Sequence, residues 1–79
     1  MVDDFISKKQ KVLEVFTNYI EQKISKQDFT EELSNFLEDP TFIQVELFKK
    51  IFEEILTYRE ELSLKDIKQR KLMLESFIY

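Results

Sequence analysis

The sequence predicts an all-α fold, a single-domain antiparallel four-helix bundle. Apolar residues recur at the three- and four-residue spacing of amphipathic helices, and three polar motifs mark helix starts. The chain contains no glycine and one proline. Tight hairpins and phosphate-binding loops favour glycine for its positive φ, so this composition disfavours them. A chain of 79 residues supports one hydrophobic core, so we expect residues 1–79 to form one helical domain.

The first helix is predicted over about residues 4–22. Apolar residues line one side of this segment, and lysines and glutamates fall between them. Asp3 or Asp4 is positioned to cap its first turn, because a short carboxylate side chain can accept from the free backbone N–H groups there.

The second helix is predicted over residues 26–37. Ser25 can accept from the backbone N–H three residues on, while Asp28 reaches back to the N–H of Ser25, which is a short variant of the capping box. Ile24 and Phe29 stand where a hydrophobic staple would place them. We therefore expect a sharp helix start at this position.

The third and fourth helices are predicted over about residues 40–60 and 64–78. Asp39 precedes Pro40, which combines a capping carboxylate with a residue that tolerates the first helical turn. The Ser-x-x-Asp pattern recurs at Ser63 and starts the last helix. The connections are short, so consecutive helices are expected to run antiparallel.

The apolar positions of these four segments form the predicted core. They are Phe5, Ile6, Val12, Leu13, Phe16, Tyr19, Ile20, Phe29, Leu33, Phe36, Leu37, Phe42, Ile43, Val45, Leu47, Phe48, Ile51, Phe52, Ile55, Leu56, Tyr58, Leu64, Ile67, Leu74, Phe77 and Ile78.

The residue types disfavour catalysis and metal binding. The chain has no histidine and no cysteine, so the usual general base and the usual zinc ligands are missing. Carboxylates alone could hold a metal where Glu53-Glu54 and Glu60-Glu61 meet, but these pairs fall on the polar side of a helix. We therefore expect no enzyme, no cofactor and no metal. The sequence shows no signal peptide and no long apolar run, which predicts a cytoplasmic protein that does not enter a membrane.

The acidic charge is concentrated in the middle of the chain. Residues 28–61 hold ten acidic and three basic residues, a net charge of −7, whereas residues 1–27 and 62–79 carry +1 and +2. One interpretation is an ordinary solvated helix face with local ion pairs. The other is an acidic docking surface for a basic protein, since charge complementarity steers association. Direct nucleic-acid binding is disfavoured because it needs clustered cations.

The docking interpretation predicts a set of partner-binding residues. Tyr58 belongs to it because an aromatic side chain surrounded by charges is typical of interface anchors, although a tyrosine at the edge of a core is the commoner case. The full set is Glu31, Glu32, Glu38, Asp39, Glu53, Glu54, Tyr58, Glu60 and Glu61.

Two stretches resemble a known family. The segment from Val12 to Phe29, VLEVFTNYIEQKISKQDF, resembles the opening of the colicin D-type immunity proteins, in which an apolar helix ends in a short polar turn before an acid and an aromatic residue. The segment from Phe52 to Tyr58, FEEILTY, is similar to that family's third helix. The resemblance implies a small helical bundle that inhibits a toxic nuclease by covering the basic groove where the toxin binds tRNA.

Three functions remain open from the sequence. The first is an immunity-type inhibitor of a basic toxin, and the second is a small phage or mobile-element regulator that binds a host protein. The third is a structural or self-assembling helical module. In each case the partner is a protein, and the chain itself is a monomer or a homodimer.

Overall fold

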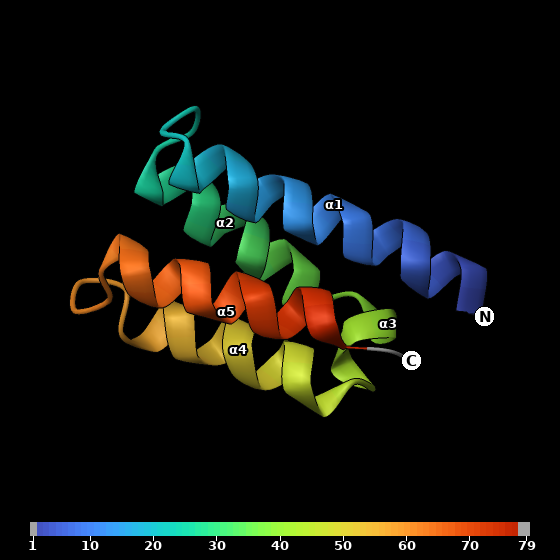
Figure 1. The fold of residues 1–79 in the computed structure, drawn as a ribbon. Coiled ribbons are helices and arrows are strands. Elements are labelled where there is room, and N and C mark those ends of the chain that lie inside the picture. Colours follow the sequence, from blue (N-terminus) through green and yellow to red (C-terminus); the bar gives the residue numbers. More distant parts are fainter. Residues whose placement is uncertain (1, 78–79) are drawn as a thin grey trace.

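The computed structural model describes residues 2–77, with side chains described from residue 4 onward, and within them the chain is all-α (Figure 1). The helices are α1 (Val2–Ile20), α2 (Lys26–Leu37), α3 (Pro40–Ile43), α4 (Glu46–Thr57) and α5 (Leu64–Ser76).

The four longer helices form a closed ring. Helix α1 packs on α2, α2 on α4, α4 on α5, and α5 returns to pack on α1. Figure 1 shows each of these helices running opposite to the previous one. In the order of the ring, α5 lies diagonally across the bundle from α2. The prediction of an all-α, antiparallel bundle is therefore confirmed.

The segment predicted as one helix over residues 40–60 is instead two helices. Helix α3 ends at Ile43, and α4 begins at Glu46 after Val45, whose φ of −105° and ψ of 100° are those of extended backbone. Helix α4 ends at Thr57, so Tyr58, Glu60 and Glu61 belong to the connection that leads to α5.

Core packing explains the interruption. On one continuous helix, at about 100° per residue, Phe42 and Ile51 would point in opposite directions. Both are buried, and the ring of Phe42 stacks on that of Phe48 with centroids 5.4 Å apart and an interplanar angle of 9°. The bend at Val45 is what lets these side chains enter the same core.

The first helix also differs from its prediction at both ends. It begins at Val2, so Asp3 and Asp4 lie inside its first turn and not at the position that precedes the helix, where a cap stands. It ends in a Schellman motif, in which the N–H of Gln22 donates to the Tyr19 carbonyl (3.0 Å) and the N–H of Lys23 to the Asn18 carbonyl (2.7 Å). This motif requires a left-handed residue, and in a chain without glycine Gln22 adopts a φ of 64°.

Replacing Gln22 by glycine is therefore expected to stabilise the protein by about 0.5–1 kcal/mol. The left-handed conformation costs a residue with a Cβ about 1–2 kcal/mol of folding free energy. Glycine avoids this cost, but it loses more backbone entropy on folding, which offsets part of the gain. Urea unfolding measures the difference. The matched control is Gln10→Gly, in the middle of α1, which should lose about 1 kcal/mol. Equal effects at both positions would contradict the explanation.

The other predicted helix starts are confirmed. The side chain of Ser25 accepts from the N–H of Asp28 (3.1 Å), and the side chain of Asp39 accepts from the N–H of Thr41 (2.9 Å). Ser63 makes the same bond to the N–H of Asp66, and here Asp66 also accepts from the N–H of Ser63. Among the described residues, only Ser63 starts a helix with both bonds of a capping box.

All eight phenylalanines lie in the core, in two groups. Phe29 joins α2 to α1, because its ring packs edge-on against Phe16 (5.1 Å between centroids) and stacks on Tyr19 (4.3 Å). The larger group, in which Phe77 follows the end of α5, consists of Phe5, Phe36, Phe42, Phe48, Phe52 and Phe77.

Four predicted core residues are exposed. Ile6, Ile43, Tyr58 and Leu64 keep between 38% and 50% of their surface in contact with solvent. Ile6 and Leu64 follow the helical spacing only at the edge of the apolar stripe, while Ile43 and Tyr58 stand at the ends of α3 and α4. Ile78, the remaining uncertain position, lies outside the described residues.

Lys9 ties the first helix to the end of the last. Its ammonium group donates to the backbone carbonyls of Glu75 (3.0 Å) and Phe77 (2.6 Å), across 66 and 68 residues of sequence. These carbonyls carry the partial negative charge of a helix C-terminus, and α5 has no basic residue in its own last turn. A cation from α1 thus stabilises the end of α5.

Candidate functional site

The structure separates the nine predicted partner-binding residues into two classes. Asp39 and Glu54 are partly buried, and each bonds to a residue elsewhere in the chain. The other residues are exposed, and they are Glu31, Glu32, Glu38, Glu53, Tyr58, Glu60 and Glu61.

Asp39 holds the start of α3 against α1. Besides accepting from the N–H of Thr41, its carboxylate pairs with the ammonium of Lys8 at 3.0 Å, and Lys8 also donates to the hydroxyl of Thr41 (3.0 Å). Partial burial alone raises the pKa of Asp39, but the hydrogen bonds from Thr41 and Lys8 outweigh it, and the pKa lies below its ordinary value. These bonds give Asp39 a structural role.

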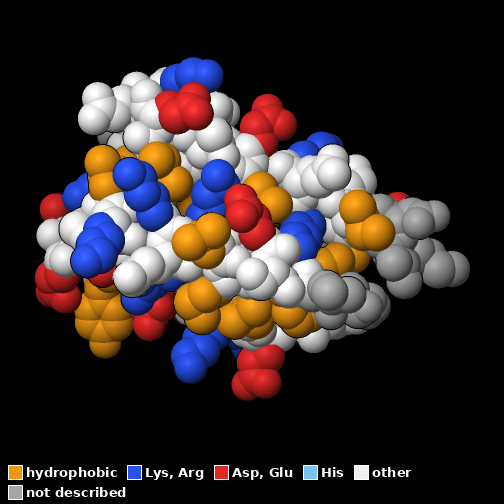
Figure 2. Space-filling view, in the orientation of Figure 1, with side chains coloured by type: hydrophobic (Ala, Val, Ile, Leu, Met, Phe, Trp, Pro, Cys, Tyr) orange, Lys and Arg blue, Asp and Glu red, His pale blue; other side chains and the backbone are white. Residues whose placement is uncertain are grey.

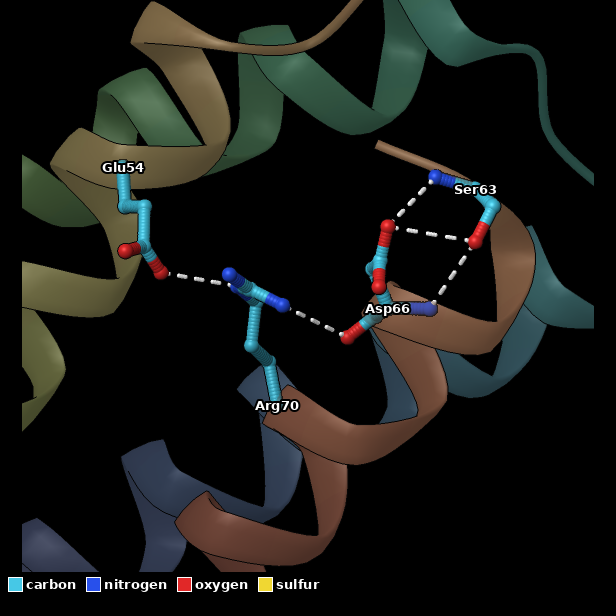
Figure 3. Close-up of polar contacts among 4 residues, drawn as sticks. All are labelled: Glu54, Ser63, Asp66 and Arg70. Atoms are coloured by element: carbon cyan, nitrogen blue, oxygen red, sulfur yellow. Dashed lines mark hydrogen bonds and ion pairs between the residues drawn. The ribbon is translucent and has the colours of Figure 1, made fainter. Parts of the chain in front are cut away.

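Glu54 joins α4 to α5. Its carboxylate accepts from the Nε of Arg70 at 2.8 Å, while the Nη1 of Arg70 donates to the backbone carbonyl of Asp66 at 3.1 Å. Figure 3 shows both contacts. The Asp66 carboxylate in turn accepts from both the N–H and the hydroxyl of Ser63, and these bonds lower its pKa. The carboxylate of Glu54 thus takes part in a contact within the chain.

Three further predicted residues, Tyr58, Glu60 and Glu61, lie in the connection after α4. Glu60 is only within 4.0 Å of the Lys26 ammonium, and its side chain keeps 80% of its surface exposed. Tyr58 occupies the C-terminal position of α4 and is half exposed. Of the three, Glu60 lines a groove whose adjoining part is lined by Glu31 of α2, as described below.

The remaining acidic residues of α2 form a compact feature, which we call the acidic ridge and define as Asp28, Glu31 and Glu32. They are spaced i, i+3 and i+4 and therefore share one helix face. All three are exposed. Within the described part of the chain, none of the three carboxylates takes part in an ion pair or accepts a hydrogen bond.

The acidic ridge borders a groove between α1 and α2. This groove is open to solvent, with a volume of about 430 Å³, and its other lining residues are Val15, Asn18 and Ile24. Val15 and Ile24 are half-buried residues that pack against the core, so they give the groove an apolar floor beside an acidic wall.

A second groove runs along the opposite side of α2, where it faces the end of α4. Its two adjoining parts, of about 410 and 290 Å³, share Gln27, Thr30 and Arg59. Lys26 and Glu60 line one part and Glu31 the other, so the charges in this groove are mixed. Glu31 is the residue of the acidic ridge that borders both grooves.

Asp28 is absent from the predicted partner-binding set. The sequence offered a different role, the return bond of a capping box, and the i, i+3, i+4 spacing from Asp28 to Glu32 was the pattern that could have placed it with the glutamates. Val15 and Ile24 had no distinguishing pattern, because a groove between two helices is visible only after the helices pack.

Among the described residues, no cluster of three or more His, Cys, Asp or Glu could hold a metal ion. None of the helices described in the structure has the length and apolarity that spanning a membrane requires. No protein-family model, curated protein or solved structure matches the chain.

Proposed function

We propose that the protein binds a basic protein partner through the acidic ridge and the groove between α1 and α2. The observation that carries this proposal is that Asp28, Glu31 and Glu32 are exposed and unpaired while they border a groove that Val15 and Ile24 also line. The carboxylates of Asp39 and Glu54, by contrast, are used for contacts within the chain.

The groove suits the side chains of lysine and arginine. Each has an aliphatic stem that can lie on Val15 and Ile24 and a cationic head that the ridge carboxylates can bind. Hydrogen bonds between a guanidinium or ammonium group and a carboxylate are roughly twice as strong as neutral ones. The partner surface is therefore basic, with long cationic side chains that project from it.

The partner that we propose is a nuclease-type toxin, and the protein acts as its immunity-type inhibitor. Two segments, Val12 to Phe29 and Phe52 to Tyr58, resemble colicin D-type immunity proteins, and this resemblance supports the inhibitor form. The first segment contains Val15 and Asn18, the residues of α1 that line the groove. An acidic ridge could occupy the basic surface with which such a toxin binds tRNA. A cytoplasmic location follows, because tRNA is the target there.

The experiment starts with affinity capture of the partner on the immobilised protein, followed by stopped-flow association with the purified partner. Glu31→Lys is expected to lower the association rate about tenfold at low ionic strength, and the effect should fade as salt screens the charges. The matched control is Glu14→Lys, an exposed residue inside α1 with the same change in charge. Equal rates for the two variants would refute the role of the ridge.

A second measurement tests the inhibitor form separately. The captured partner is assayed for RNA cleavage with and without the wild-type protein. Inhibition that Glu31→Lys weakens would support the toxin proposal. A partner without nuclease activity, bound through the ridge, would overturn the inhibitor form and leave the binding site intact.

A further inference from the structure

The outer side of α5 carries apolar side chains that the bundle does not cover. The helix buries Ile67 and Leu74 against its neighbours. Leu72 lies two residues before Leu74 and, at about 100° per residue, points almost directly away from the core. Leu72 keeps 59% of its surface exposed and Met73 keeps 50%. Among the described residues, Leu72 is the most exposed of the large hydrophobic side chains.

Charged side chains flank Leu72 in a regular arrangement. Lys68 and Glu75 precede and follow it by four and three residues, so both lie on its helix face, about two turns apart. Glu75 contacts Lys71 in its own chain at 3.4 Å, which holds the carboxylate near this face. Lys68 has no ion pair among the described residues. Figure 2 shows hydrophobic side chains interspersed with lysines and arginines on this side of the molecule.

We propose that this face binds a second copy of the chain, with the two α5 helices antiparallel about a two-fold axis. An axis midway between residues 71 and 72 passes within half a residue of Leu72, so the two Leu72 side chains lie next to each other across it. The same axis sets Lys68 opposite Glu75 of the partner subunit and, by symmetry, Glu75 opposite the partner subunit's Lys68. A two-fold contact of this kind uses one self-complementary patch on both copies.

Charge complementarity selects this orientation. In the antiparallel arrangement, Lys68 and the partner's Lys68 are separated by about seven residues of helix rise, roughly 10 Å. A parallel arrangement in register would place the two lysines side by side, and the like charges would repel. Two other cations near α5 are engaged within the chain, since Arg70 bonds to Glu54 and Lys9 bonds to the carbonyls at the helix end. Lys68 has no such contact, and this register sets it opposite Glu75 of the partner subunit.

The dimer and the acidic ridge are compatible. Helix α5 lies diagonally across the ring from α2, so a contact through α5 leaves the ridge exposed. The two ridges then lie on the outer sides of the dimer, where each can contact its own partner. This inference rests on α5 alone and is independent of the proposed toxin.

A charge-exchange experiment tests the register. Sedimentation of the purified protein from about 10 μM to about 1 mM should show a weak monomer–dimer equilibrium, as expected for a small interface. Lys68→Glu and Glu75→Lys should each weaken self-association about tenfold, because like charges then meet. An equimolar mixture of the two variants should associate more tightly than either alone, since every pair across the axis is then opposite in charge.

Two results of these measurements would overturn the proposal, and the glutamine variants below add a third. One is a wild-type protein that stays monomeric over this concentration range. The other is a mixture that associates no better than the separate variants. Leu72→Gln provides a variant that leaves the charges unchanged, and it should abolish dimerisation. Its matched control is Ile43→Gln, at a similarly exposed residue on α3, which should not change dimerisation. Equal effects of the two glutamine variants would show non-specific association and exclude the α5 contact.

Discussion

Phe48→Ala is expected to destabilise the protein by about 3–5 kcal/mol, the usual cost of truncating a fully buried phenylalanine. Phe48 has no exposed surface, and its ring packs against four others. The distances between ring centroids are 5.3 Å to Phe5, 5.4 Å to Phe42, 6.0 Å to Phe52 and 5.5 Å to Phe77. Truncation opens a cavity where α1, α3, α4 and the end of α5 meet, and no neighbour can collapse to fill it without leaving its own contacts.

The expected loss is a large share of the total stability. At roughly 0.05–0.15 kcal/mol per residue, a chain of this length has about 4–12 kcal/mol of stability. Urea unfolding followed by circular dichroism measures the loss. Tyr58→Ala is the control, because this aromatic residue is half exposed and should cost less than about 1 kcal/mol. Similar losses at Phe48 and Tyr58 would contradict the assignment of the core.

Asp39→Ala is expected to cost about 1–2 kcal/mol at neutral pH. The side chain caps α3 through the N–H of Thr41, and its carboxylate pairs with Lys8 of α1. Caps of this kind contribute about 1 kcal/mol, and a hydrogen bond to a charged group adds a comparable amount. Ser25→Ala removes a cap without an ion pair and should cost less.

The contribution of Asp39 is also expected to depend on pH. Hydrogen bonds from Thr41 and Lys8 place the folded-state pKa below the ordinary aspartate value. A group with a lowered folded-state pKa stabilises the fold above its unfolded pKa of about 3.9, and that stabilisation is lost as pH falls through the folded value. Asp39→Asn keeps a capping oxygen and removes the charge. The stability difference between the wild type and this variant should therefore shrink below about pH 4. A difference that is constant from pH 7 to pH 3 would contradict the ion pair.

The sequence predicts the helices best where local chemistry determines them. Ser25, Asp39 and Ser63 cap helices as expected because each capping bond spans only two or three residues. The interruption at Val45 has no local signature, since neither glycine nor proline stands there and the apolar residues continue through it. It arises because Phe42 and Phe48 are both drawn into one core, which is a tertiary effect.

The sequence predicts an excess of acidic residues in the middle of the chain, but it does not predict which of them remain unpaired. Composition alone locates the excess of acids between residues 28 and 61. Which of them remain unpaired depends on partners far along the chain, because Asp39 bonds to Lys8 across 31 residues and Glu54 to Arg70 across 16. Pairings at such distances are set by how the helices pack, and no spacing rule within one helix predicts them.

The bond from Lys9 to the end of α5 has a mechanical consequence. Helix α1 begins and α5 ends at the same end of the bundle, and the two helices lie antiparallel against each other. A force applied between the two ends of the chain therefore peels these helices apart from that end, one turn after another, and does not slide them past each other. The bonds from Lys9 to the carbonyls of Glu75 and Phe77 are among the first to bear the load. The initial resistance to pulling thus comes from the Lys9 side chain and from the neighbouring contact between the rings of Phe5 and Phe77.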